Sequence, residues 1–211
     1  MATFKQGILG GFSGKVGPVI GSSWKGKAVM RAMALSYNDA NTVAQQQQRA
    51  KFGLVSKFIS AVAAFVSKGF KGQAVNMTEA NVAMKANIPG MISGAWPSYT
   101  LDYTKAVLAK GTVALPYAPQ GSVTGTDVEI TWTDNSGIGN ALANDTINVL
   151  AFNATRNQAV VNMDTVTRSE RNITVSCPAN WTGDTIYVYL FAKRHDLSDT
   201  SDSTFIGTYT I

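Results

Sequence analysis

The sequence predicts an α+β protein: a glycine-rich N-terminal arm, a β-hairpin and two helices, followed by an antiparallel β-sandwich of immunoglobulin or fibronectin type. Three observations predict it. Seven of the first 26 residues are glycine. Apolar residues then recur at helical spacing over 52–66, and short alternating segments separated by turn residues fill the C-terminal half. We expect a basic domain over 1–110 and an acidic sandwich domain over 111–211.

The charge of the chain divides between these two halves. Residues 1–110 carry 13 Lys and Arg against 3 Asp and Glu, a net charge of +10, whereas residues 111–211 carry 5 against 10, a net charge of −5. This division indicates that the basic half meets nucleic acid or another anionic surface, or that the basic half of one copy meets the acidic half of another. The sequence leaves both partners open.

The N-terminal arm combines glycine with apolar residues. Ordering its backbone costs about 1–2 kcal/mol per residue, and apolar side chains left exposed favour association. We therefore expect the arm to order against a neighbouring subunit or partner, or alternatively on its own helix at 52–66. The predicted contact residues are Phe4, Ile8, Leu9 and Phe12, with Lys15, Trp24, Lys25, Lys27, Arg31 and Arg49.

The stretch GSSWKGKA, residues 21–28, matches the phosphate-binding pattern G-x-x-x-x-G-K-[ST] except at its last position. Ala28 lacks the hydroxyl that holds magnesium, and no acidic residue before 110 ends an apolar strand. Residues 27–35 alternate, with Lys27 and Arg31 on the wetter face, which favours a strand over the helix that such a loop requires. We predict a hairpin with its loop at 21–26 and no nucleotide hydrolysis.

Two helices are expected after the hairpin. Thr42 and Gln45 form a capping box, and the apolar stripe that follows ends near Gly69. The stripe comprises Phe52, Val55, Ile59, Val62 and Val66. Its spacing is typical of core packing, with a helix contact between subunits as the alternative. A second helix is predicted from Thr78 to just before Pro89.

From Tyr99 onward the apolar period becomes that of strands. Leu101, Tyr103 and residues 106–108 predict a strand that crosses into the second half, and Trp132 is predicted in the sandwich core. The further predicted strands are Val128–Trp132, Ile147–Phe152, Ile173–Val175, Ile186–Leu190 and Phe205–Ile211. The single cysteine excludes the disulfide of antibody domains.

Residues with catalytic or metal-binding chemistry are few. His195, the only histidine, lies in a polar loop, and no G-x-S-x-G motif occurs, so we interpret it as a surface residue. Asp196, Asp199 and Asp202 lack the glycine and final glutamate of a calcium-binding EF-hand. Cys177 is interpreted as a small buried side chain. We predict a non-enzymatic protein without catalytic residues, cofactor or metal.

The run GFSGKVGPVIGSSWKGKAVMR, followed by TVAQQQQRAKF, resembles an uncharacterised family of similar length from Bacteroidetes bacteria and their phages. Gly14–Gly17, Trp24–Gly26 and Arg31 carry the resemblance, together with a T-x-x-Q-x-x-x-R helix start at Thr42, Gln45 and Arg49. It runs the length of the chain but is sharp only over 7–52, and the Pro-rich turn of the family reads SYNDANT here. A looser similarity extends to phage structural proteins. The resemblance therefore suggests a relation to these proteins, but it implies no enzymatic activity or mechanism.

Two hypotheses follow from these observations. The first is a structural or assembly protein, preferably a virion component of capsid, decoration or tail, which forms homo-oligomers or binds other virion proteins through its N-terminal half. The alternative is a nucleic-acid-binding protein, in which Trp24 stacks on a base, although no RNP motif, helix-turn-helix or zinc finger occurs. We recognise no secretory signal and expect no membrane insertion, because Lys57 and several serines interrupt the longest apolar stretch. The expected location is the virion or the cytoplasm.

Overall fold

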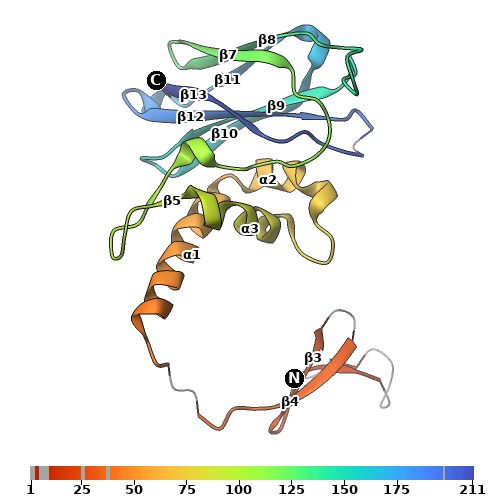
Figure 1. Cartoon of the computed structure of the whole chain (residues 1–211), viewed down its shortest axis with the longest axis vertical. Coiled ribbons are helices and arrows are strands. Elements are labelled where there is room, and N and C mark those ends of the chain that lie inside the picture. The colour runs from red at the N-terminus through yellow and green to blue at the C-terminus, as the bar shows by residue number, and fades with distance from the viewer. Residues whose placement is uncertain (1–2, 5–9, 25–26, 37–38, 197) are drawn as a thin grey trace. The chain divides into compact units, whose positions relative to one another are not determined.

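A computed structural model of the chain describes residues 3–4, 10–24, 27–36, 39–196 and 198–211, with side chains from residue 10 onward (Figure 1). The predicted α+β class is confirmed: an antiparallel sheet comes first, then helices, then antiparallel sheets packed together. The chain forms two compact units, Met1–Thr42 and Val43–Ile211. The predicted boundary at 110 thus falls inside the second unit.

The first unit is an antiparallel meander in the order β1-β2-β3-β4. Its strands are β1 (Thr3–Phe4), β2 (Phe12–Val16), β3 (Val19–Trp24) and β4 (Lys27–Ala32). The hairpin loop predicted over 21–26 is wrong, because residues 21–24 belong to β3 and pair with β4. Gly21 fits within the strand because the Phe12 ring and carbonyl lie where a β-carbon would be. Residues 25–26 lie outside the described residues.

The predicted first helix is two helices, α1 (Val43–Ala61) and α2 (Ala63–Gly69), bent by 86° where they meet. The bend lies at Val62, whose ψ of 17° is not helical. Four residues of the apolar stripe are buried as expected, whereas Phe52 is 52% exposed. Among the described helices none is by itself long and apolar enough to cross a membrane, although the bent pair of α1 and α2 passes that test by length and composition.

Helix α3 (Glu79–Met91) begins as predicted, with the Thr78 hydroxyl accepting from the Asn81 amide at 3.4 Å. It does not stop before Pro89 but continues two residues beyond it, although the proline removes one i→i−4 hydrogen bond. The short 3-10 helices of the second unit are η1 (Lys71–Gln73), η2 (Tyr103–Lys105), η3 (Arg168–Glu170) and η4 (Ala179–Trp181).

The strand predicted from Leu101 to Leu108 is also wrong. Strand β6 (Thr100–Leu101) pairs only with β5 (Ile92–Ser93), and η2 follows it. The Asp102 carboxylate causes this turn, because it accepts from both the amide (3.1 Å) and the hydroxyl (2.6 Å) of Thr104. Beyond η2, the buried Asn87 of α3 holds Val107 through two backbone hydrogen bonds.

Two antiparallel sheets, ordered β10-β9-β12-β13 and β11-β8-β7, pack together in the second unit. Their strands are β7 (Tyr117–Thr124), β8 (Asp127–Thr133), β9 (Thr146–Asn153), β10 (Gln158–Thr167), β11 (Asn172–Ser176), β12 (Thr185–Lys193) and β13 (Thr204–Thr210). The remaining five sequence predictions are confirmed as β8, β9, β11, β12 and β13. Two further strands, β7 and β10, are not predicted from the sequence. Pro119 and Gly121 are unfavourable residues for a strand such as β7, and a bulge at residues 162–166 interrupts the alternation of β10.

The sheet that contains β9 and β12 separates two hydrophobic cores. On one side, Leu150, Phe152, Tyr189 and Phe191 pack against the helices, which lie beneath this sheet in Figure 1. On the other side, Ile147, Val149, Val188 and Leu190 pack against the second sheet, where Trp132 is buried as predicted. The helices therefore cover an apolar sheet face rather than forming a separate domain.

This shared sheet generates a prediction about fragments. We expect residues 43–211 to unfold cooperatively in urea, whereas residues 111–211 expose the four large side chains that face the helices and aggregate or bind a hydrophobic dye. Far-UV circular dichroism and dispersed amide spectra of both fragments check this. A 111–211 fragment as well folded as 43–211 would contradict it and restore the boundary near 110.

A buried ion pair generates a second prediction. Arg168 and Asp145 are both fully buried, and the guanidinium donates to Asp145 (3.3 Å), to Asn135 Oδ1 (2.7 Å) and to the carbonyls of Ala114 and Leu142. Arg168→Ala removes the fully buried partner of this carboxylate and leaves it only the outer ion pair with Arg194, so it should lower the free energy of unfolding by about 3–5 kcal/mol. Arg194→Ala, which removes the outer partner of Asp145, should cost about 1 kcal/mol or less. If urea unfolding shows the same loss of unfolding free energy for Arg168→Ala and Arg194→Ala, the buried ion pair contributes no more to stability than the outer one.

Candidate functional site

The register of the first unit sorts its side chains onto two faces, because residues directly opposite each other in antiparallel strands share a face. Pairing of Gly14 with Gly21 and of Gly21 with Met30 defines one face, which is uncharged. We call it the apolar face: Phe12, Gly14, Val16, Val19, Gly21, Ser23, Ala28, Met30 and Ala32. The opposite one is the cationic face: Ser13, Lys15, Ile20, Ser22, Trp24, Lys27, Val29 and Arg31.

The cationic face gathers its charges in two rows. Lys15 and Arg31 flank Ile20 in one row, and Lys27 lies opposite Trp24 in another. With strands about 4.8 Å apart, the backbones of Lys15 and Arg31 are about 10 Å apart. Strands β2, β3 and β4 contain no acidic residue. The face therefore presents three positive charges, with the Trp24 ring 69% exposed beside them.

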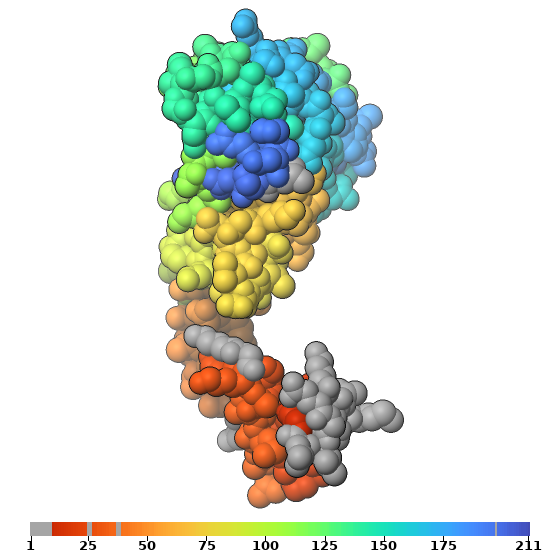
Figure 2. All heavy atoms as spheres, turned by 90° about the vertical axis from the view of Figure 1, so that its right-hand side faces the viewer, coloured from red at the N-terminus to blue at the C-terminus, as the bar shows by residue number. Residues whose placement is uncertain are grey.

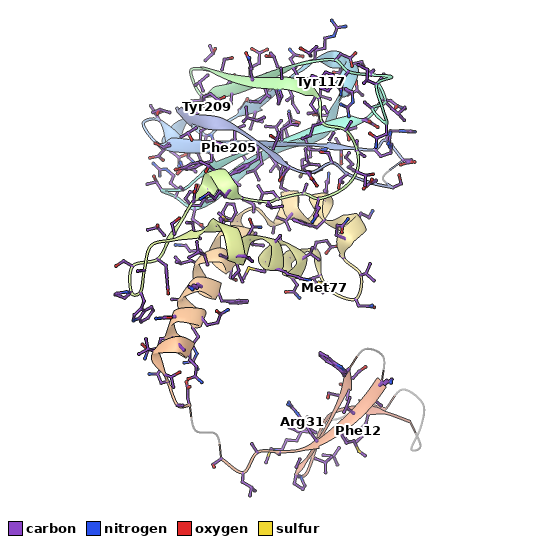
Figure 3. The ribbon with its side chains drawn as sticks, in the orientation of Figure 1. Phe12, Arg31, Met77, Tyr117, Phe205 and Tyr209 are labelled. Atoms are coloured by element: carbon purple, nitrogen blue, oxygen red, sulfur yellow. The ribbon has the colours of Figure 1, made fainter. Side chains whose placement is uncertain are left out.

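The described strands β2, β3 and β4 form one small sheet, whose residues are red and orange in Figure 2. Within the described residues from 10 to 36, only Gly21 is buried, and every residue of β4 is exposed. Met30 on the apolar face is 71% exposed. A sheet normally buries one face against another layer of structure. Phe12 covers Gly21 on the apolar face, while Met30 on that face and Trp24 on the cationic face stay exposed. Phe12 and Arg31 lie on opposite sides of the sheet (Figure 3).

The predicted contact residues fall into four groups. Lys15, Trp24, Lys27 and Arg31 lie together on the cationic face, and Phe12 lies on the other face. Arg49 belongs to α1 in the second unit. Ile8, Leu9, Lys25 and the Phe4 side chain lie outside the described residues, so their role stays a prediction. Met30, Val29 and Ile20 also lie on these faces and are not among the predicted contact residues, although the alternation of 27–35 places Met30 opposite the lysine-bearing face.

The stretch that resembles a phosphate-binding loop has a different geometry. Residues 21–24 are in β3 and Lys27 begins β4, so no helix follows the glycine-rich segment. A phosphate loop depends on the amides of a helix N-terminus. The described backbone around Lys27 offers a strand edge instead.

A pocket of about 260 Å³ in the second unit is lined by three lysines, Lys68, Lys71 and Lys193, with Asp164 and Asp199. Asp164 binds Lys193 at 2.9 Å and also pairs with Lys68, which joins α2 to β12. Burial alone would raise the pKa of Asp164, but its hydrogen bonds with the two lysines outweigh burial and lower that pKa. Asp164, Lys68 and Lys193 are engaged with each other, so we interpret these three residues as a structural tie between the helices and the sheet.

The other reactive side chains have structural surroundings. His195 is exposed in its loop, as predicted. Asp199 accepts hydrogen bonds from Thr112, and Asp202 accepts one from the Gly111 amide, so both hold the loop onto the segment before β7. Among the described residues no cluster of three His, Cys, Asp or Glu is placed to hold a metal ion. Cys177 is buried as predicted, and burial, helped by Asp127, raises the pKa of its thiol to about 11.

The chain belongs to a family of unknown function, DUF6266, whose model matches residues 11–207. A search of curated proteins found no match. The match covers both compact units and agrees with the resemblance to an uncharacterised family. It says nothing of the source organisms or of an activity, so the site is interpreted from its own geometry.

The Asp164 tie generates a prediction of pH dependence. Because its pKa is lower in the folded state than the usual unfolded value of about 3.9, the carboxylate stabilises the fold at neutral pH, and this contribution is lost as the pH falls through the folded pKa. Asp164→Asn should lower the free energy of unfolding by about 1–3 kcal/mol at neutral pH, since Lys193 is left buried without its partner. The deficit should shrink in acid. Asp196→Asn, at an exposed position, is the matched control; a deficit that does not change with pH would refute the assignment.

Proposed function

We propose that this protein is a non-enzymatic structural protein that assembles through its N-terminal sheet. The observation that supports this most directly is the small sheet of β2, β3 and β4, in which Gly21 is the one buried residue among those described from 10 to 36, whereas the second unit has cores of its own. Such a sheet gains stability when another layer covers it. A neighbouring copy or another structural protein supplies that layer.

The N-terminal sheet, which we call the connector, has two different contact surfaces. The apolar face offers Val16 and Met30, 51% and 71% exposed, for burial at about 25 cal/mol per Å². The cationic face offers charge, which steers encounter and makes association sensitive to salt. A middle layer with both faces in use joins neighbours on either side, which suits an assembly component.

The non-enzymatic part of the proposal rests on how the polar groups of the second unit are used. Its buried ion pair, its lysine-lined pocket and its aspartate-rich loop direct their hydrogen bonds inward, to carbonyls, amides and each other. Catalytic groups need a free position beside a substrate. The virion assignment, with a capsid, decoration or tail component as its form, rests on the looser similarity to phage structural proteins and is the narrower part of the proposal.

A second candidate function is nucleic-acid binding through the cationic face, which the exposed Trp24 beside Lys27 favours. Three charges on this face predict a modest salt dependence, with log K falling against log salt by a slope of about −2 on single-stranded DNA. Fluorescence anisotropy with a labelled oligonucleotide over a salt series measures that slope. Trp24→Ala should then weaken binding by about 1–3 kcal/mol.

Deletion of residues 1–42 tests the assembly proposal. We expect the full chain to form oligomers in light scattering after size exclusion, and residues 43–211 to be monomeric with an unchanged unfolding transition, because the second unit keeps its cores. Met30→Asp, which places a charge on the apolar face, should weaken the oligomer, while Met77→Asp, at an exposed position of the second unit, should not. Oligomers that survive the deletion would refute the proposal.

A further inference from the structure

We propose that the cationic face of one copy docks on the outer face of the β11-β8-β7 sheet of a second copy, so that copies join head to tail. This inference rests on the proposed function, in which the N-terminal sheet mediates assembly. It adds the identity of the partner surface.

The partner surface is built around two acidic residues of β8. Asp127 and Glu129 are two residues apart and point outward, since Val128 and Ile130 between and after them are buried. The register places Thr124 and Ser176 beside Asp127. We call this surface the acidic face: Tyr117, Gln120, Ser122, Thr124, Asp127, Glu129, Thr131, Thr133, Asn172, Thr174 and Ser176. None of these residues is Lys or Arg.

The two faces are complementary in charge and in side-chain length. The cationic face carries three positive charges and the acidic face two negative ones. The acidic face is paved mainly with short Ser and Thr side chains, which leaves room for the long side chains of Lys15, Arg31 and Trp24. Both surfaces belong to antiparallel sheets with strands of five to eight residues, about 17–27 Å long, so they match in size. Packing of one sheet on another is a common arrangement in proteins.

The pattern within the cationic face favours a protein sheet over a nucleic acid. Ile20 lies between Lys15 and Arg31 across the strands, and Val29 lies between Lys27 and Arg31 along β4. Apolar residues between the charges gain from burial against a sheet, whereas a phosphate backbone offers them nothing. Three cations also give few phosphate contacts compared with proteins that bind nucleic acid tightly.

The contact differs from the usual symmetric dimer. It uses two different surfaces of the chain, so it is heterologous and builds rings or open filaments. Three strands about 4.8 Å apart and about 17–27 Å long give each face a footprint of roughly 250–400 Å², below the roughly 800 Å² per partner of a stable interface. A single contact is therefore weak, and assembly should rise with concentration and fall with salt.

Exchange of charges between the faces tests the proposal in the full chain. One variant carries Lys15→Glu and Arg31→Glu, and the other carries Asp127→Lys and Glu129→Lys. Each alone opposes like charges and should lose oligomers in light scattering at low salt. Mixed together they present opposite charges again, and we expect assembly to return. If the cationic face instead docked on the acidic face of its own chain, mixing the two variants could not restore that contact, because each chain carries only one of the two charge reversals.

Matched controls reverse the same number of charges elsewhere in the second unit: Lys71→Glu with Lys85→Glu, and Glu79→Lys with Asp196→Lys. These should assemble like the original chain. Should the reversed sheet variant misfold by circular dichroism, the Asp127→Lys, Glu129→Lys variant alone still decides, because its changes lie on a sheet with an intact core. If it assembles normally, the acidic face is not the partner.

The outcomes separate this inference from the proposed function. Loss of oligomers on deletion of residues 1–42, without rescue on mixing, overturns the acidic face as partner but leaves assembly through the sheet intact. A full chain that is monomeric at all concentrations overturns both. Retention of oligomers by the Lys15→Glu, Arg31→Glu variant, combined with loss of its binding to single-stranded DNA, would assign the cationic face to nucleic acid instead.

Discussion

The second unit depends on one constraint: β9 and β12 are covered on both faces at once. Along these strands the side chains alternate between two cores, with Leu150 and Phe152 toward the helices and Val149 and Ala151 toward the other sheet. The helices on one side of this sheet and the β11-β8-β7 sheet on its other side must therefore fold together with it. The bend between α1 and α2, the segment held by Asn87 and the tie at Asp164 all serve to lay helices on this sheet. Removal of one layer exposes the sheet that the other layer needs.

The two units of the chain solve the problem of apolar burial in opposite ways. The second unit encloses its apolar residues between layers, and it leaves polar sheet surface outside, as on the outer face of β8. Among the described residues of the first unit, Met30 and Trp24 are exposed large side chains, and only Gly21 of residues 10–36 is buried. The described part of the first unit thus buries little, whereas the second unit is stabilised by two cores. This difference is the physical basis for regarding residues 12–32 as a connector.

Local patterns predicted many elements correctly and some boundaries badly. The alternation in β8 and β11, the Thr78 cap and the strand character of 27–32 depend on neighbours in sequence, and each was confirmed. The errors came from interactions at longer range. The glycine pattern predicts a loop at Gly21, but pairing with Met30 keeps this residue in β3. The apolar pattern after Leu101 predicts a strand, but the hydrogen bonds of Asp102 to Thr104 stabilise a 3-10 helix there. One signal was overlooked: the nearly unbroken apolar runs of β9 and β12 are typical of strands buried on both faces.

The sequence by itself determined the class of fold, the helical stripe, most strands of the second unit and the division of charge between the halves, because period, turn residues and composition are local properties. It also indicated that Lys27 and Arg31 share a face, since alternation fixes which side of a strand a residue takes. Only the tertiary structure decided that the helices pack on the C-terminal sheets, because the apolar pattern of a helix or a strand does not identify the element against which it is buried. The register between strands likewise decided that Lys15 and Trp24 join Lys27 and Arg31 on one face: strand pairing, and not sequence spacing, brings them together.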